Sequence, residues 1–207
     1  PHIPRRDLER AAEICRRLGV RQHILSFNPL DIPEIRAGNV NRCYLCKREM
    51  FNRIREFAGP KRFDIIADGS NTDDDISDRP GLQALRELQI VSPLQEAGLN
   101  REEVEIYLKQ RELEDFLRPQ SACLLTRIPF GDQGDAEALS RIDRAEEFLQ
   151  TIVTGRVRCR AHKRLARIEV EPDELQSAID HREEIVQRLR QLGFDHITLC
   201  LTGYKTK

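Results

Sequence analysis

Six cysteines are the residues in this 207-residue chain with the most evident chemical potential. Cys43 and Cys46 are separated by two residues and are followed by Lys47, at the point where a helical pattern begins. Two thiolates at this spacing can hold one metal ion or part of an iron–sulfur cluster, or they can act as a redox pair. A single CxxC motif also occurs by chance, so the spacing alone does not choose between these chemistries.

Cys123 is the candidate for a third ligand. It lies in a segment rich in proline and arginine, Pro119–Gly131, where a cysteine is a poor core filler. Three cysteines can hold a [4Fe–4S] cluster with one iron left open, and that iron can carry a ligand such as sulfide. The remaining cysteines that lie in apolar patterns are expected to be small buried hydrophobic residues: Cys15, Cys159 and Cys200.

An acidic loop, Asp68–Gly81, directly follows the apolar run Phe63–Ala67. Open α/β sheets bind ligands beyond the carboxyl ends of their parallel strands, so the position of this loop indicates a binding site. Ser70 and Asn71 offer hydrogen bonds, and the carboxylates could hold a hard cation such as Mg2+. A solvated acidic turn is the competing interpretation.

Three arginines, Arg156, Arg158 and Arg160, alternate along a predicted strand and therefore share one of its faces. Neighbouring guanidinium groups repel each other unless they meet anions, so a phosphate or carboxylate ligand is indicated. Cross-strand pairing that involves Arg167 and Glu169, together with solvation, is the alternative.

Two kinds of structure must position these residues. Up to about Leu113, helical stretches alternate with apolar runs at Val20–Phe27 and Phe63–Ala67, which predicts an α/β layer with a parallel sheet. Helices are predicted for three stretches of this part, the last with Asn100 as its N-cap: Leu8–Leu18, Cys46–Phe57 and Arg101–Leu113.

The pattern changes after an irregular segment at residues 115–135. The elements predicted beyond it are a helix, two strands, a helix and a strand, at Ala136–Leu149, Arg156–Ala161, Leu165–Val170, Asp173–Leu192 and His196–Leu201. This order predicts a small α+β sandwich with helices on one face of a sheet. We therefore expect three parts, residues 1–114, a linker at 115–135, and residues 136–207.

The composition narrows the class of protein. The chain has 34 Lys+Arg against 35 Asp+Glu, a net charge of -1 and 39% hydrophobic residues. These values argue against a disordered, collagen-like or membrane protein, and nucleic acid is not an expected partner. We expect a cytoplasmic protein that does not bind membranes.

Taken together, the motifs resemble those of the LarE-type ATP-dependent sulfur transferases in the PP-loop ATP pyrophosphatase superfamily. The matching blocks occur in the family's order and cover nearly the whole chain: Cys43–x–x–Cys46–Lys47, Asp68–Gly–Ser–Asn71–x–Asp–Asp with Arg79–Pro–Gly81, Ser92–Pro–Leu94, Ala122–Cys–Leu with Arg127–Ile–Pro–Phe–Gly131, and Arg156–Val–Arg158 with Ala166–Arg–Ile–Glu169.

The resemblance implies an enzyme that adenylylates a substrate carboxylate with ATP and Mg2+ and then inserts sulfur, as in nickel-pincer nucleotide cofactor biosynthesis. It implies a carboxylated nucleotide as the acceptor and a homo-oligomeric protein. Residues 1–114 would be a PP-loop domain, an adenine nucleotide alpha hydrolase-like parallel sheet layer, and residues 136–207 a domain for substrate binding or oligomerisation.

The resemblance also implies roles for particular residues. Cys123 matches the family's sulfur-donor position, and Glu146 matches an acidic residue near it. The presence of Cys43 and Cys46 is similar to the members that hold a [4Fe–4S] cluster on three cysteines, whereas other members sacrifice the sulfur of one cysteine. The residues expected at the nucleotide and at the substrate phosphate are Asp68, Ser70 and Asn71, and Arg156 and Arg158, respectively.

One departure from the family concerns the pyrophosphate-binding Ser-Gly-Gly-x-Asp-Ser loop, which does not occur in the 207 residues. In relatives this loop lies ahead of the position of Pro1. We therefore expect that an N-terminal βαβ unit, typically about 30 residues or more, is missing, that the PP-loop layer is incomplete, and that a chain of these residues alone is inactive.

Two other functions are open. A PP-loop tRNA thiolase also uses a CxxC motif and one further cysteine, but such enzymes need a broad basic face. A non-catalytic module could instead be stabilised by zinc on Cys43, Cys46, Cys123 and a histidine. Salt-sensitive tRNA binding would favour the first alternative, and a colourless zinc protein the second.

Overall fold

The computed structural model describes residues 1–74, 80–117 and 122–205, which divide into two compact units. The predicted acidic loop and cysteine loop extend into residues 75–79 and 118–121, which lie outside the described residues. The units are made of these ranges: unit 1 of Pro1–Glu13, Leu30–Gly38 and Gln120–Lys207, and unit 2 of Ile14–Pro29 and Asn39–Pro119. Helix α1 (Arg5–Arg17) contributes residues to both.

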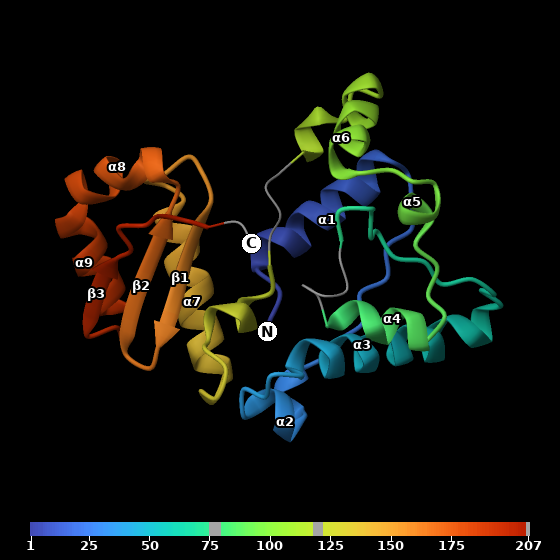
Figure 1. Cartoon of the computed structure of the whole chain (residues 1–207), viewed down its shortest axis with the longest axis horizontal. Coiled ribbons are helices and arrows are strands. Elements are labelled where there is room, and N and C mark those ends of the chain that lie inside the picture. The colour runs from blue at the N-terminus through green and yellow to red at the C-terminus, as the bar shows by residue number, and fades with distance from the viewer. Residues whose placement is uncertain (75–79, 118–121, 206–207) are drawn as a thin grey trace. The chain divides into compact units, whose positions relative to one another are not determined.

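Unit 1 contains a three-stranded sheet with the order β1-β2-β3 (Figure 1). Strands β1 (Val157–His162) and β2 (Leu165–Val170) form an antiparallel hairpin, and β3 (His196–Leu199) runs parallel to β2. These three strands confirm the strand positions predicted for this part of the chain.

Helices cover one face of this sheet. Val157, Cys159 and Ala161 of β1 are buried, and α7 (Ala136–Leu149) packs against this strand. Helix α9 (Arg182–Gln191) packs against both α7 and β3 (Figure 1). The predicted α-β-β-α-β order is therefore confirmed, except that the second predicted helix is divided into two helices. The other short elements of this region are η1 (Pro29–Asp31), α2 (Pro33–Arg36), η4 (Leu124–Arg127), η5 (Pro172–Glu174) and α8 (Leu175–Asp180).

Unit 2 consists mainly of helices. Phe51, Leu82, Leu85 and Ile90 form its buried core. Asn100 caps the last long helix: its side chain accepts a hydrogen bond from the backbone N–H of Glu103 in a capping box, which confirms the predicted N-cap. The elements are α3 (Arg42–Ala58), η2 (Gly59–Lys61), α4 (Gly81–Glu87), α5 (Pro93–Glu96), α6 (Arg101–Gln110) and η3 (Glu114–Phe116).

The parallel sheet predicted for unit 2 is not present in the described residues. Val20–Phe27 is not a strand, and the run before Asp68 forms only an isolated parallel bridge between Ala67 and Val91. Phe63 and Ile65 are 60% and 72% exposed, whereas the strands of a parallel sheet are normally buried. The physical reason is that a strand requires a hydrogen-bonded neighbour along its length, and here Val91 pairs with the run at one point.

The chain is thus a mixed α and β protein, and the finer assignment of residues 1–114, 115–135 and 136–207 to particular domains stays a prediction. None of the helices in the described part of the chain has the length and apolar character that crossing a bilayer requires.

Candidate functional site

The CxxC pair lies at the start of α3 in unit 2. Cys43 and Cys46 are three residues apart within this helix, so their side chains lie on the same side of it. Cys43 is exposed and Cys46 is half-buried. Gly81 allows α4 to approach here, because a Cβ at this position would lie 3.2 Å from Cδ of Lys47 and 3.5 Å from the carbonyl oxygen of Cys43. Two accessible thiols on one side of a helix fit two ligands of an iron–sulfur cluster.

Lys47 connects this helix to the acidic loop. Its Nζ lies 3.7 Å from Oδ2 of Asp68. The same oxygen accepts a 2.6 Å hydrogen bond from Ser70 Oγ, and Oδ1 of Asp68 accepts a 2.7 Å hydrogen bond from Ser92 Oγ. Burial by itself would raise the pKa of Asp68, but these hydroxyl groups and Lys47 hold the pKa below its ordinary value. Asp68 therefore stays ionised and fixes the loop against α3.

Ser70 and Asn71 shape the same loop. Ser70 is buried, and the side-chain oxygen of Asn71 accepts a 3.0 Å hydrogen bond from the backbone N–H of Asp73. The backbone N–H of Asn71 donates to Oδ2 of Asp74 at 3.1 Å. The polar groups that the sequence assigns to nucleotide binding thus form a structured turn, and their contact with a nucleotide stays a prediction.

Cys123 lies in unit 1, where it directly precedes η4. Its carbonyl oxygen accepts hydrogen bonds from the hydroxyl and the backbone N–H of Thr126, at 2.7 and 2.9 Å. The backbone N–H of Leu124 donates to the carbonyl oxygen of His2 at 2.8 Å. The cysteine itself is half-buried. These hydrogen bonds hold it on a short turn whose backbone is fixed.

A buried ion pair anchors this turn. Nε of Arg127 lies 2.6 Å from Oε1 of Glu146, and the two side chains are 3% and 0% exposed. Glu146 also accepts a 3.0 Å hydrogen bond from the backbone N–H of Cys159 and lies 3.3 Å from a guanidinium nitrogen of Arg6. The carboxylate of Glu146, which the resemblance places near the sulfur donor, therefore has partners at both of its oxygens. It connects the turn of Cys123 to α7 and β1.

Two arginines of the predicted row have acidic partners. Nε of Arg156 lies 2.5 Å from Glu171 Oε1, and Nε of Arg160 lies 2.6 Å from Glu169 Oε1. Arg160 also donates a 3.1 Å hydrogen bond to the carbonyl oxygen of Thr126, and so links β1 to the turn that follows Cys123. Pairing with acidic side chains therefore explains how the positive charges of Arg156 and Arg160 are balanced without a ligand.

Arg158 differs from these two because its side chain forms no ion pair or hydrogen bond with any described residue. Its guanidinium carbon lies 4.3 Å from the ring centroid of Tyr204, and that of Arg156 lies 4.6 Å from the same ring. Burial lowers the pKa of Arg158, and the positive charges of Arg127 and Arg160 act in the same direction, whereas Tyr204 and Glu169 act against the shift. Because a guanidinium stays protonated in proteins, this half-buried positive charge favours an anionic ligand.

The sequence did not identify Tyr204 as part of this site, because no spacing rule relates it to β1. The described residues within each unit bring together no group of three or more His, Cys, Asp and Glu side chains that could hold a metal ion. Arg158 and Cys123 belong to one unit, whereas Cys43 and Cys46 belong to the other.

No model of a known protein family matches the chain. An uncharacterised protein of Methanocaldococcus jannaschii is 33% identical over 189 residues, which cover 91% of this chain and 74% of that protein. An uncharacterised protein of Synechocystis is 32% identical over 208 residues, which cover 100% of this chain and 78% of that protein.

A third relative is the pyridinium-3,5-bisthiocarboxylic acid mononucleotide synthase of Lactiplantibacillus plantarum. It is 24% identical over 200 residues, which cover 97% of this chain and 72% of the synthase. The distant likeness to this synthase supports the LarE-like character of the group. The chain belongs to the same protein family as the Methanocaldococcus and Synechocystis proteins, a LarE-like family.

Proposed function

We propose that the protein is an ATP-dependent sulfur transferase that acts on a carboxylate of a pyridinium mononucleotide. The observation that carries this proposal is Arg158, a half-buried guanidinium that lies over the ring of Tyr204 and forms no ion pair with a described residue. The phosphate of a mononucleotide is an anion that such a group recognises. The name of the Lactiplantibacillus relative, a pyridinium bisthiocarboxylic acid mononucleotide synthase, supports the substrate class.

The reaction we propose has two steps. A carboxylate oxygen of the acceptor attacks the α-phosphorus of ATP, pyrophosphate leaves, and an acyl adenylate forms. A sulfur nucleophile then attacks the acyl carbon and AMP leaves, so that sulfur replaces one carboxylate oxygen. Arg158 and Arg156 would hold the acceptor's phosphate, and the loop of Asp68, Ser70 and Asn71 would close on ATP and its Mg2+.

We assign the sulfur source to three cysteines that together would hold a [4Fe–4S] cluster, Cys43, Cys46 and Cys123. When bound, such a cluster supplies sulfide at its open iron. The anchoring of Cys123 through Thr126 and Arg127 supports its part, because a ligand on a well-bonded turn is held in place.

A second sulfur source is Cys123 itself. In that case its thiolate attacks the acyl carbon and AMP leaves. Loss of the Cα proton and cleavage of the Cβ–S bond then release the thiocarboxylate and leave dehydroalanine at this position. The two routes differ in whether Cys43 and Cys46 are required.

The function is tested with the protein as its gene encodes it, incubated with ATP, Mg2+ and pyridinium-3,5-biscarboxylic acid mononucleotide. Mass spectrometry should show an acceptor in which sulfur has replaced one oxygen, together with AMP. An unchanged acceptor, with iron and sulfide present in the anaerobically purified protein, would contradict the proposal.

Cysteine variants separate the two sulfur sources. With a cluster, Cys43→Ala, Cys46→Ala and Cys123→Ala should each lose the brown iron–sulfur absorbance and sulfur transfer. With a sacrificial cysteine, only Cys123→Ala should lose transfer, and each wild-type chain should react once and lose the mass of one H2S. Cys200→Ala is the matched control and should retain both properties.

A further inference from the structure

One face of the sheet in unit 1 brings together three arginines and one glutamate. Alternate residues of β1 are buried on the side where α7 packs, so Arg158 and Arg160, which lie between them, point to the opposite face. The residue of β2 directly opposite Arg158 is Glu169. The residue directly opposite Arg160 is Arg167. These four side chains therefore share one face and carry three positive charges against one negative charge.

Glu169 does not pair with the arginine directly opposite it. Its Oε1 lies 2.6 Å from Nε of Arg160 and accepts a 2.9 Å hydrogen bond from a terminal guanidinium nitrogen of Arg167. Like charges directly opposite each other in a sheet destabilise it, and a carboxylate bound to both groups offsets this repulsion. Burial by itself would raise the pKa of Glu169, but the two arginines hold the pKa below its ordinary value. Glu169 is therefore ionised and paired away from Arg158.

Arg160 holds Glu169 more firmly than Arg167 does. Its distance to the carboxylate is the shorter one, and its side chain is less exposed to water. Its guanidinium also donates a 3.1 Å hydrogen bond to the carbonyl oxygen of Thr126, which fixes it from a second side. Removing Arg160 would therefore release Glu169 to a larger extent than removing Arg167.

A Glu169 side chain released from Arg160 can reach Arg158. Directly opposite residues of antiparallel strands have Cβ atoms only about 4.5–5.5 Å apart. The negative charge of Glu169 already acts on the pKa of Arg158, so the two groups interact electrostatically without forming an ion pair. If the carboxylate turned toward Arg158, it would occupy the guanidinium that we assign to the acceptor's phosphate.

We propose that Arg160 is a positioning residue that holds Glu169 away from Arg158 and thereby keeps Arg158 available for the acceptor's phosphate. The inference rests on the proposed function, in which Arg158 binds that phosphate. Arg160 acts through Glu169 and need not touch the acceptor. Without Arg160, the carboxylate and the phosphate would compete for one guanidinium, because both are anions that it binds through charge-assisted hydrogen bonds.

Calorimetric titration of the protein as its gene encodes it, with pyridinium-3,5-biscarboxylic acid mononucleotide, tests the proposal by rescue. Arg160→Gln should weaken acceptor binding about tenfold or more. The double variant Arg160→Gln/Glu169→Gln should regain most of this affinity, because the competing carboxylate is gone. A purely structural role of Arg160, through Thr126, would not be rescued by the second change. Arg160→Lys, which keeps a positive charge beside Glu169, should bind more tightly than Arg160→Gln.

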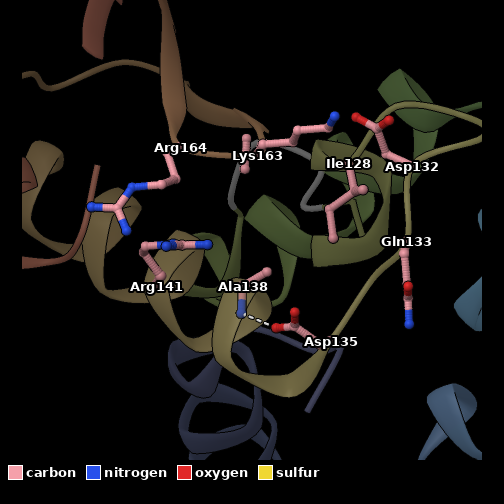
Figure 2. Close-up of a pocket in the computed structure, with 9 residues that line it drawn as sticks. Ile128, Asp132, Gln133, Asp135, Ala138, Arg141, Lys163 and Arg164 are labelled. Atoms are coloured by element: carbon pink, nitrogen blue, oxygen red, sulfur yellow. Dashed lines mark hydrogen bonds between the residues drawn. The ribbon is translucent and has the colours of Figure 1, made fainter. Parts of the chain in front are cut away.

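Arg164→Gln is the matched control. Arg164 also forms an ion pair in unit 1, with Asp195. It lines a pocket near the beginning of α7 that none of the four side chains on the sheet face lines (Figure 2). Arg164→Gln should therefore bind the acceptor like the wild type.

The position of Glu169 can be followed without the acceptor, by NMR of the Nε–H group of Arg158. This signal is identified by its loss in Arg158→Lys. It should shift in Arg160→Gln and return toward its wild-type position in the double variant. An unshifted signal in Arg160→Gln, or an acceptor affinity that the double variant does not regain, would overturn the proposal. The expected NMR shifts in a protein whose wild type does not bind the acceptor would support the positioning of Glu169 and contradict the proposed function.

Discussion

Unit 1 and unit 2 each contain short apolar runs of similar length, but the runs behave differently. In unit 1, Val157–His162 pairs along its whole length with Leu165–Val170, and the helices bury one face of the resulting sheet. In the described part of unit 2, Phe63–Ala67 meets Val91 at one bridge and leaves Ile65 72% exposed. An apolar run becomes a strand only where the chain also supplies its hydrogen-bonding neighbour.

The charged groups of the two units differ in a similar way. In unit 1 the ion pair of Arg127 and Glu146 is almost completely buried. In unit 2 the pair of Lys47 and Asp68 is longer, at 3.7 Å, and Lys47 is 30% exposed. We therefore expect single changes in unit 1 to have larger effects than matched changes in unit 2.

The largest difference should be in thiol reactivity. Cys159 of unit 1 is fully buried, and burial raises the pKa of its thiol, whereas Cys43 of unit 2 is exposed. Alkylation of Cys159 requires unit 1 to open, and a domain stable by about 5 kcal/mol is open in fewer than about one molecule in 10³. In metal-free protein, peptide mass spectrometry should show Cys43 reacting with iodoacetamide about 10³-fold faster or more. Similar rates would mean that the sheet of unit 1 is not stably closed.

The next largest effect should come from Glu146→Gln. This change leaves the charge of Arg127 buried without its counterion, which typically costs about 3–5 kcal/mol. Urea denaturation followed by circular dichroism measures the loss in the free energy of unfolding. The matched control is Glu183→Gln, because Glu183 pairs with Arg182 at the surface, where such pairs contribute less than about 1 kcal/mol. A loss no larger than that of the control would refute the anchoring role of Glu146.

A smaller effect is expected for Asp68→Asn in unit 2. The hydroxyl groups of Ser70 and Ser92 would lose a charged acceptor, which typically costs about 1–3 kcal/mol. Because the pKa of Asp68 is lower in the folded state than in the unfolded state, its stabilising contribution is present above the unfolded pKa and is lost as the pH falls through the folded pKa.

The difference in unfolding free energy between wild type and Asp68→Asn should therefore be largest near neutral pH and shrink in strong acid. Urea titrations at a series of pH values from about 7 downward measure it. A difference that is equal at all pH values, or that grows in acid, would contradict the sign of this shift.

Local signals in the sequence predicted much of the fold. The helix Ala136–Leu149 and the strand Leu165–Val170 have the predicted bounds, because apolar periodicity and caps are properties of neighbouring residues. The predicted helix Asp173–Leu192 is interrupted at His181, where the backbone leaves the helical region. Periodicity does not report such an interruption, since apolar residues continue at helical spacing on both sides of it, at Ala178 and at Ile185.

Features that depend on distant residues were not predictable. Nothing in the sequence pairs Arg127 with Glu146, or places Tyr204 under Arg158, because these contacts arise only when the turn, α7 and β1 pack together. The expectation that Cys15 and Cys200 are buried was wrong, since both are only half-buried. Apolar neighbours in sequence indicate burial only if another element covers that face.

The central claim is that Arg158 binds the phosphate of a carboxylated pyridinium mononucleotide, and calorimetric titration with pyridinium-3,5-biscarboxylic acid mononucleotide tests it most directly. Arg158→Ala removes contacts worth about 1.5–3 kcal/mol, so the acceptor should bind about one to two decades more weakly than to the wild type. Arg182→Ala is the exposed control and should not change the affinity. A folded Arg158→Ala variant that binds the acceptor as tightly as the wild type would contradict the claim.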